Sequence, residues 1–255
     1  MLASAAALLA YIFALWALSL PLRDVSVADP GWGLGFVLVG WIAFGLGDGF
    51  LGRRVLLAGI VSLWGLRLSG YLLVRKLFER REDHRYTAIR DRFGPRFPLI
   101  SFVVVFLLQG MLIWTVSLPI QVSATLPDRF GALDWVGVAT WAVGVFFEAV
   151  GDGQLARFKK DPANAGRVMD RGLWRYTRHP NYFGDFMVWW GIYLVALSTG
   201  SAWWTIVAPV VMSTFLIRWS GMALLEKHLS RRSGYAEYVA RTSAFLPRRP
   251  RRSSR

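Results

Sequence analysis

Two pairs of polar side chains stand at positions where this chain could bind a ligand. Glu148 and Asp152 are four residues apart within one apolar stretch, and Asn181 and Asp185 are four residues apart at the start of another. In a helix this spacing places both members of a pair on the same face. A carboxamide next to a carboxylate can hydrogen-bond an amide such as nicotinamide, or a ribose hydroxyl. These pairs are therefore our first candidates for a site.

Basic and aromatic residues precede the second pair. The stretch FKKDPANAGRVMDRGLWRYTRHPNYFGD covers residues 158–185. Its cations and rings are Lys159, Lys160, Arg167, Arg171, Arg175, Arg178, Trp174, Tyr176 and Tyr182. Fixed cations beside aromatic rings suit a phosphate-bearing ligand with a ring to stack. The plainer interpretation is a basic surface loop before a helix that begins at Pro180, and both stay open on composition alone.

Other kinds of site find little support in the sequence. The chain has no cysteine, which excludes disulfides, thiolate nucleophiles and cysteine zinc sites. His84 and His228 lack the close spacing of a motif such as HExxH, so we expect no metal. No Walker loop or GxSxG occurs, and we expect helices and their loops to hold any nucleotide.

The elements that must position these residues are transmembrane helices. Of 255 residues, 55% are hydrophobic, and a span needs about 20 mostly apolar residues. The predicted fold class is all-α, an integral membrane bundle of seven helices. The expected spans are residues 2–22, 31–51, 55–74, 99–122, 133–155, 182–197 and 203–225. We expect one membrane-embedded domain over 1–247, its cofactor half at about 148–247, and a basic disordered tail at 248–255.

The basic residues indicate how the bundle is oriented. The net charge is +14, and residues 75–96, 157–178 and 227–255 hold eight, seven and nine of the basic residues. Basic segments stay on the cytoplasmic side, which predicts an outside N-terminus and a cytoplasmic C-terminus. Only Arg53 and Arg54 disagree. Topology and contact with anionic membrane lipids account for the charge, so we expect no nucleic-acid partner. The sequence leaves the oligomeric state open.

Several charges fall inside the predicted spans, where they are costly. Arg67, with Tyr71 one turn later, lies in the third span, and Arg218 lies in the seventh. Paired with Glu148 or Asp152, these arginines would form structural ion pairs. Alternatively, the four charges line a polar cavity open to the cytoplasm, which we favour.

The run GLWRYTRHPNYFGD at residues 172–185 resembles the signature of the steroid 5-alpha-reductase C-terminal family, in its bacterial DUF1295 branch. The likeness is best from about residue 148 to 247. It implies an NADPH-dependent reductase of a carbon–carbon double bond in an apolar, steroid-like or other lipid substrate. It also implies a multi-pass protein of the bacterial cell membrane.

The resemblance assigns roles residue by residue. Asp152 matches a cofactor-contacting aspartate, Lys159 a basic residue at the phosphates, and Asn181 with Asp185 the pair at the nicotinamide end. The NADPH-binding residues expected on this basis are Glu148, Asp152, Lys159, Lys160, Arg167, Arg175, Arg178, His179, Asn181, Tyr182, Asp185, Glu226, Tyr235 and Tyr238.

The N-terminal half departs from the steroid enzymes. Those enzymes use a Glu and a Tyr to hold the keto group and deliver a proton. Here Trp64 stands at the Tyr position and cannot act as an acid, and no glutamate matches the Glu. We assign Trp64 and Arg67 to substrate binding. Because reduction by hydride needs a proton donor, Tyr71, Glu82 and Tyr86 become the catalytic candidates.

A rival family shares the same C-terminal pattern. Isoprenylcysteine and phospholipid methyltransferases, which use S-adenosylmethionine, are similar in an RHPxYxG run, an acidic pair and a tyrosine-rich tail. This chain has only one acid of that pair, Glu226, followed by Tyr235 and Tyr238. S-adenosylmethionine carries no phosphate and needs no cation cluster, so we favour the reductase. A scaffold that has lost its chemistry is a third possibility, because fold alone does not decide function.

Overall fold

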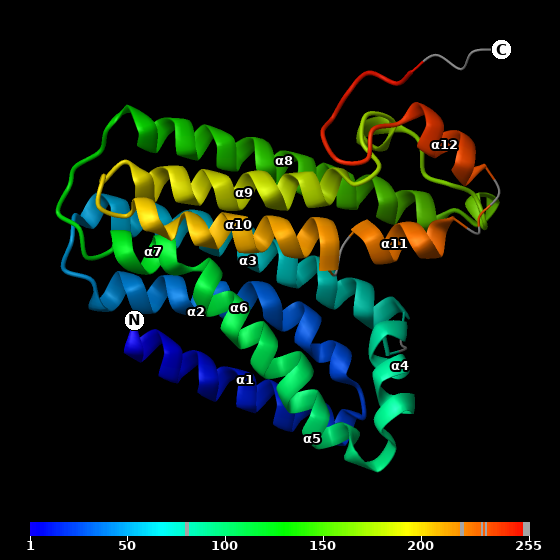
Figure 1. Ribbon diagram of the computed structural model, residues 1–255, viewed down its shortest axis with the longest axis horizontal. Coiled ribbons are helices and arrows are strands. Elements are labelled where there is room, and N and C mark those ends of the chain that lie inside the picture. The colour runs from blue at the N-terminus through cyan, green and yellow to red at the C-terminus, as the bar shows by residue number, and fades with distance from the viewer. Residues whose placement is uncertain (80–81, 220–221, 231, 233, 252–255) are drawn as a thin grey trace. The chain divides into compact units, whose positions relative to one another are not determined.

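The computed structural model describes residues 1–79, 82–219, 222–230, 232 and 234–251 (Figure 1). Its regular elements are helical, and an isolated bridge pairs Thr177 with Ser243. Five helical segments are long and apolar enough to cross a membrane: Leu2–Leu22, Val25–Leu46, Leu51–Phe78, Arg85–Val116 and Ala132–Lys160. A shorter apolar segment is Trp203–Arg218. The all-α prediction is confirmed, and the protein is a multi-pass membrane protein by helix composition.

The chain divides into two compact units, which we describe separately. The N-terminal unit comprises residues 1–130 and 199–208, and the C-terminal unit comprises 131–198 and 209–255. The prediction of one domain over 1–247 stays a prediction.

Helices of the N-terminal unit are joined by short connections. They are α1 (Leu2–Leu22), a 3-10 turn (Val25–Val27), α2 (Ala28–Leu46), α3 (Leu51–Glu79), α4 (His84–Phe93), a second 3-10 turn (Gly94–Arg96), α5 (Phe97–Ser101), a π-helical stretch (Phe102–Leu107), α6 (Leu108–Val116), α7 (Leu118–Ser123) and a third 3-10 turn (Trp203–Ile206).

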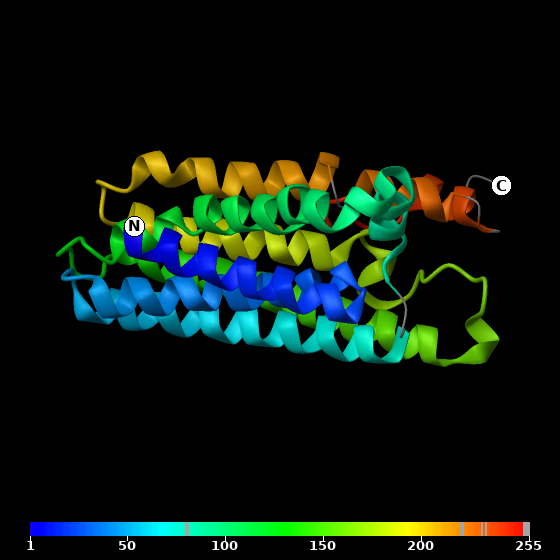
Figure 2. The ribbon, with the colours of Figure 1, turned by 90° about the horizontal axis from the view of Figure 1, so that it is seen from below.

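Helices α2 and α3 lie side by side along their lengths (Figures 1 and 2). Glycines allow this approach: a Cβ on Gly33 would lie 2.4 Å from the carbonyl oxygen of Gly65. Small residues at such crossings are typical of membrane helix pairs. Next to the crossing, Phe36 and Trp64 are fully buried with ring centroids 5.6 Å apart, so this interface is an apolar core.

The two arginines that disagreed with the charge pattern have structural partners. Arg53 is fully buried and donates to the carbonyl oxygens of Asp128 and Arg129. Arg54 donates from Nε to the carbonyl oxygen of Phe44, 3.0 Å away, near the end of α2. These bonds satisfy carbonyls that a helix end or a loop would otherwise leave without a donor. Arg53 therefore holds the loop at Asp128 and Arg129, and Arg54 holds the end of α2.

The C-terminal unit begins with the longest of its helices. Its elements are α8 (Ala132–Lys160), two 3-10 turns (Pro162–Asn164 and Gly172–Arg175), α9 (Pro180–Leu197), α10 (Val207–Thr214, starting at the unit boundary), a π-helical stretch (Phe215–Trp219), α11 (Met222–Leu229) and α12 (Tyr235–Arg241). At the start of α8, buried Asp134 accepts a hydrogen bond from the backbone N–H of Gly131 at 2.8 Å.

Helices α8 and α9 pack along their lengths, again through glycines (Figure 1). A Cβ on Gly184 would lie 2.5 Å from the backbone nitrogen of Glu148 and 2.6 Å from the carbonyl oxygen of Gly144. A Cβ on Gly191 would meet Trp141 in the same way. Glycine at these positions therefore brings the backbone of α9 against α8.

Most of the predicted spans correspond to helices, with shifted ends. The second begins earlier, at Ala28, and the third runs on to Glu79. The predicted polar connection 75–96 contains α4, and the fourth span is divided at Ser117. The predicted sixth span corresponds to α9, which has 18 residues. Residues 220–221 of the seventh lie outside the described part, so the count of seven stays a prediction.

Candidate functional site

The buried acids of the C-terminal unit lie on α8. Glu148 is 3% exposed and Asp152 is 5% exposed, one helical turn apart on the face that α9 covers. Burial of carboxylates among apolar helices costs free energy that packing alone does not repay. The close approach at Gly184 places Glu148 directly against α9.

Helix α9 brings the amide of the second pair to these acids. Its first residue is Pro180, as predicted, because proline suits the first helical position. Asn181 Nδ2 donates to Asp152 Oδ1 at 3.2 Å, and Asn181 Oδ1 accepts from the backbone N–H of Tyr182 at 3.1 Å. Asp185 lies one turn further along and is partly buried. Glu148, Asp152 and Asn181 thus meet in one helix-pair interface, and Asp185 lies one turn further along α9.

The connection between α8 and α9 is held onto α8. Gln154 Oε1 accepts from the backbone N–H of Leu173 at 2.9 Å, and buried Trp174 donates from Nε1 to the carbonyl oxygen of Gly151 at 3.0 Å. Gly172 has a φ of +59°, which glycine adopts without strain. This folded connection starts α9 next to Asp152.

An ion-pair cluster closes the start of α9 onto α11. Arg178, 9% exposed, pairs with Glu226 at 2.7 Å, and fully buried His179 places Nε2 3.1 Å from the same oxygen. The hydrogen bond with His179, helped by Arg178 and opposed by burial, holds the pKa of Glu226 below its usual range. The ring of Tyr182 stacks on His179 with centroids 5.5 Å apart. His179 Nδ1 is buried without a hydrogen-bond partner among the described residues.

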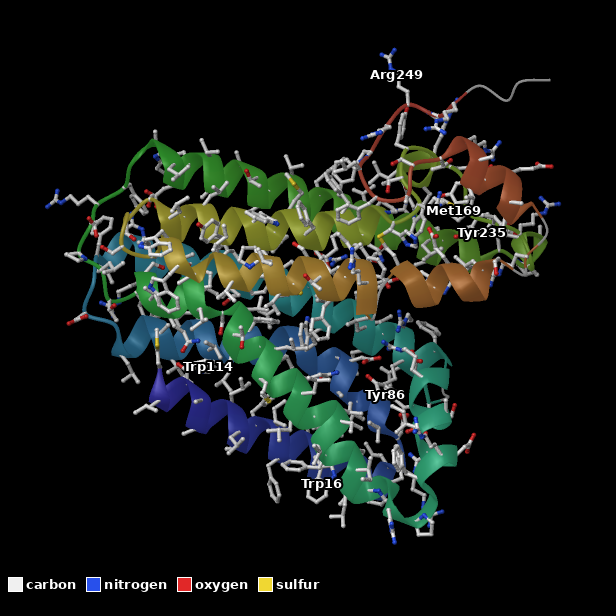
Figure 3. All side chains as sticks on the ribbon, viewed as in Figure 1. Trp16, Tyr86, Trp114, Met169, Tyr235 and Arg249 are labelled. Carbon is white, nitrogen blue, oxygen red and sulfur yellow. The ribbon has the colours of Figure 1, made fainter. Side chains whose placement is uncertain are left out.

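The C-terminal segment wraps over this cluster. Arg178 also donates to the carbonyl oxygen of Thr242 at 2.9 Å, and Thr177 Oγ1 donates to that of Phe245 at 2.7 Å. Tyr238, whose pKa burial raises, donates to the carbonyl oxygen of Trp174. Tyr235, labelled in Figure 3, is 4% exposed and belongs to the same helix α12. The predicted tyrosine-rich segment is therefore part of the wall around Arg178.

The predicted phosphate-binding cations lie on the surface of the C-terminal unit. Lys159 and Lys160 are exposed in the last turn of α8, and Arg167 and Arg175 are exposed in the connection. Among the described residues no three His, Asp and Glu side chains are arranged to hold a metal ion. Lys159 follows Asp152 by seven residues, about two helical turns, on the same helix α8.

The substrate and proton-donor candidates fall in the N-terminal unit. Trp64 is buried in the α2–α3 core, and the guanidinium of Arg67 lies 5.8 Å from the ring centroid of Tyr71. Glu82 pairs with Arg90 at 2.7 Å, and Tyr86 donates to Asp29 at 2.7 Å. The structure groups Arg67 with Tyr71 but ties Glu82 and Tyr86 into separate contacts. Their roles in catalysis stay predictions.

Several residues of these clusters were missed from the sequence. Asp29, the partner of Tyr86, lies just before the predicted second span, and an acid in the first turn of a helix next to Pro30 was the available signal. Gln154 and Thr177 gave no signal, because their partners are distant in sequence. The side chains of His84 and His228 lie outside the described part of the structure.

Comparison with known proteins gives a family but no activity. An uncharacterized protein of Schizosaccharomyces pombe is 28% identical over 224 residues, which cover 76% of this chain and 64% of the yeast protein. The chain thus spans less than two thirds of that relative's length. No solved structure matches. A family model described as a protein of unknown function, DUF1295, matches residues 15–242, so the chain belongs to the DUF1295 family.

Proposed function

We propose that this protein is a membrane-bound, NADPH-dependent reductase of a carbon–carbon double bond in an apolar substrate, such as a lipid or steroid-like enone. The observation that carries the proposal is the hydrogen bond between Asn181 and Asp152, made beside buried Glu148. Polar groups of this kind between membrane helices are expensive, and an intramembrane ionisable residue is by default a candidate for a functional site.

The chemistry of these groups fits the nicotinamide end of the cofactor. The bond that Asn181 donates to Asp152 uses one of the two N–H donors of its carboxamide. The bond that it accepts from the backbone N–H of Tyr182 uses one of the two acceptor sites of its oxygen. One donor and one acceptor remain, which is the pattern that a ligand carboxamide complements. Asp185, one turn later, would meet the adjoining ribose hydroxyls.

The exposed cations fit the other end of the cofactor. Lys159, Lys160, Arg167 and Arg175 would hold its phosphates, because charge-assisted bonds to phosphate are strong even at a partly open site. NADPH supplies a hydride when bound. The chain must then supply a proton near the receiving carbon or oxygen, and Tyr71, Glu82 and Tyr86 are our candidates. Exclusion of water by the helices would protect the transfer.

The proposal includes a membrane arrangement. We infer seven spans with the N-terminus outside and the cofactor site on the cytoplasmic side of a bacterial cell membrane, where the basic segments belong. Substrate would enter from the bilayer, and membrane lipids would surround the apolar faces. The burial of Arg53 supports this orientation, because it explains the exception by a role in the connection at Asp128.

The test is calorimetric titration of the detergent-purified protein with NADPH. Asn181→Ala and Asp185→Ala should each weaken binding by about tenfold, which corresponds to roughly one lost hydrogen bond to a ligand. Glu237→Ala, which removes an exposed acid of α12, should bind like the wild type. Wild-type affinity in both site variants would contradict the placement of the cofactor.

One observation favours a second function, methyl transfer from S-adenosylmethionine. Glu226 is held by Arg178 and His179 next to α12, so the acid and the tyrosine-rich tail of the methyltransferase pattern meet in one cluster. Titration with S-adenosylmethionine separates the two proposals. Binding of S-adenosylmethionine alone would replace the reductase by a methyltransferase, and binding of neither ligand would favour a scaffold without chemistry.

A further inference from the structure

The arginines of helix α4 fall into two groups, one with carboxylate partners in the N-terminal unit and one exposed. Arg85 and Arg90 turn inward: Arg85 contacts Asp29 at 3.1 Å and Asp83 at 3.0 Å, and Arg90 contacts Glu82 at 2.7 Å. Arg90 also lies over the ring of buried Phe97, 4.2 Å from its centroid. These two arginines are therefore used within the N-terminal unit to hold α4 against α2 and α5.

Arg92 and Arg96 are the remaining arginines of this region, and both are exposed. They are four residues apart across the turn at Gly94, whose φ is +50°. Among the described residues, Arg92 lies over the ring of its neighbour Phe93, 5.5 Å from the centroid. Asp91 is exposed next to Arg92, but one carboxylate does not cancel the charges of two arginines, so this surface stays positive. Two cations are thus presented outward without an internal carboxylate.

These arginines stand at the end of an apolar surface. Leu99 of α5 is 71% exposed, and Leu22 at the end of α1 is 54% exposed. Trp16 of α1 donates from Nε1 to the carbonyl oxygen of Pro98 at 2.9 Å, which joins α1 to the start of α5 (Figure 3). Exposed leucines of a membrane helix face lipid tails, and a tryptophan marks the level where tails give way to headgroups. Helix α4 also runs across the direction of α3 at this end (Figure 1).

We propose that Arg92 and Arg96 bind the phosphate of an anionic phospholipid headgroup, with α4 lying in the headgroup layer. Exposed leucines on α1 and α5, together with outward cations on α4 and the turn after it, match a lipid whose tails lie along α1 and α5. A net negative lipid is favoured over a zwitterionic one because a choline group brings its own positive charge. The site is independent of the proposed reductase activity.

Native mass spectrometry of the full-length protein in detergent tests this site, with phosphatidylglycerol and phosphatidylcholine as probes. We expect the wild type to retain phosphatidylglycerol in preference to phosphatidylcholine. Arg92→Gln and Arg96→Gln should each reduce phosphatidylglycerol affinity about fivefold, since a cation near an anionic headgroup contributes about that factor. The double variant R92K/R96K should keep the preference. Arg129→Gln, an exposed arginine of another connection, is the matched control and should change nothing.

Thermal unfolding in lipid-free detergent separates lipid binding from a structural role. Arg92 lies in the last turn of α4, where a cation also stabilises the helix end. If the Gln variants unfold at lower temperature but keep the wild-type lipid preference, that structural role is sufficient and the proposal is wrong. The proposal is equally wrong if Arg129→Gln lowers phosphatidylglycerol affinity as much as Arg92→Gln does.

Discussion

The two units are each built around a pair of helices whose backbones meet at glycines. In the α2–α3 pair, a Cβ on Gly65 would lie 2.7 Å from the carbonyl oxygen of Gly33. In the α8–α9 pair, a Cβ on Gly184 would lie 2.6 Å from that of Gly144. Close approach of this kind strengthens packing where no hydrophobic effect drives membrane helices together. Backbone geometry is thus common to both pairs.

The side chains beside these crossings differ. Phe36 and Trp64 fill the α2–α3 interface with apolar rings, whereas the α8–α9 interface buries Glu148 and Asp152, with half-buried Asn181 bonded to Asp152. An apolar filling would stabilise α8 and α9 at least as well, since buried charges lose their hydration. The polar groups of α8–α9 are therefore candidates for a role other than stability, and the comparison distinguishes an apolar helix pair from a candidate cofactor-binding pair.

The largest expected effect comes from inserting one methyl group at Gly184. In Gly184→Ala the Cβ meets the backbone of Glu148, so α9 must move away from α8. We expect the free energy of unfolding to fall by about 3 kcal/mol, the upper range for overpacking. We also expect loss of NADPH binding, because Asn181 moves away from Asp152. Thermal unfolding and calorimetry measure the two effects.

Gly65→Ala is the matched change in the other pair. Its Cβ also meets backbone, so it should destabilise the protein by a similar amount while the folded fraction binds NADPH like the wild type. Equal loss of NADPH affinity in the folded fraction of both variants would remove the distinction between the apolar pair and the cofactor-binding pair. Retained affinity in Gly184→Ala would have the same consequence.

A smaller change alters charge without volume. Asp152→Asn removes a buried negative charge and leaves an oxygen that can still accept from Asn181. We expect unfolding stability to stay unchanged or rise by about 1 kcal/mol, while NADPH affinity falls about tenfold. Phe36→Leu in the α2–α3 pair should behave in the opposite way, losing about 1 kcal/mol of stability at unchanged affinity. A stability loss in Asp152→Asn would show that the charge itself holds α8 and α9 together.

Local sequence patterns predicted the apolar helices and part of the site. The hydropathy of a segment is a property of consecutive residues, so the local runs of apolar residues were enough to predict α1, α3 and α8. Pro180 and the spacing of Asn181 and Asp185 likewise act within one helix. The buried acids of α8 were visible because a charge inside an apolar run is unusual.

Contacts between distant residues were not predictable in the same way. The pairing of Arg178 with Glu226 joins positions 48 residues apart, and that of Tyr86 with Asp29 joins positions 57 apart. The reason why Arg53 departs from the charge pattern was not visible in the sequence, because its carbonyl partners lie 75 and 76 residues away. Such contacts arise from chain topology, which a single sequence does not specify.

The ion-pair cluster of the C-terminal unit should make stability depend on pH. The pKa of Glu226 is lowered from 4.5 in the folded state, so its contribution is complete above that pH and is lost as pH falls through the folded value. We expect thermal stability to fall below pH 4.5 more steeply in the wild type than in Glu226→Gln. At pH 7 that variant should lose about 1–3 kcal/mol, because Arg178 and His179 exchange a charged shared acceptor for a neutral one. Parallel pH profiles for the two proteins would exclude Glu226 as the source of the pH dependence of stability.

The smallest expected effect tests the corresponding polar cluster of the N-terminal unit. Tyr86→Phe removes the hydroxyl that donates to Asp29, while Arg85 still contacts that carboxylate. We expect a loss of about 1 kcal/mol, the usual contribution of one hydrogen bond, seen as faster amide hydrogen exchange in α4. NADPH affinity should not change, because Tyr86 belongs to the unit that holds no proposed cofactor contact. If affinity does fall, the proposed set of cofactor contacts on α8, α9 and their connection is incomplete.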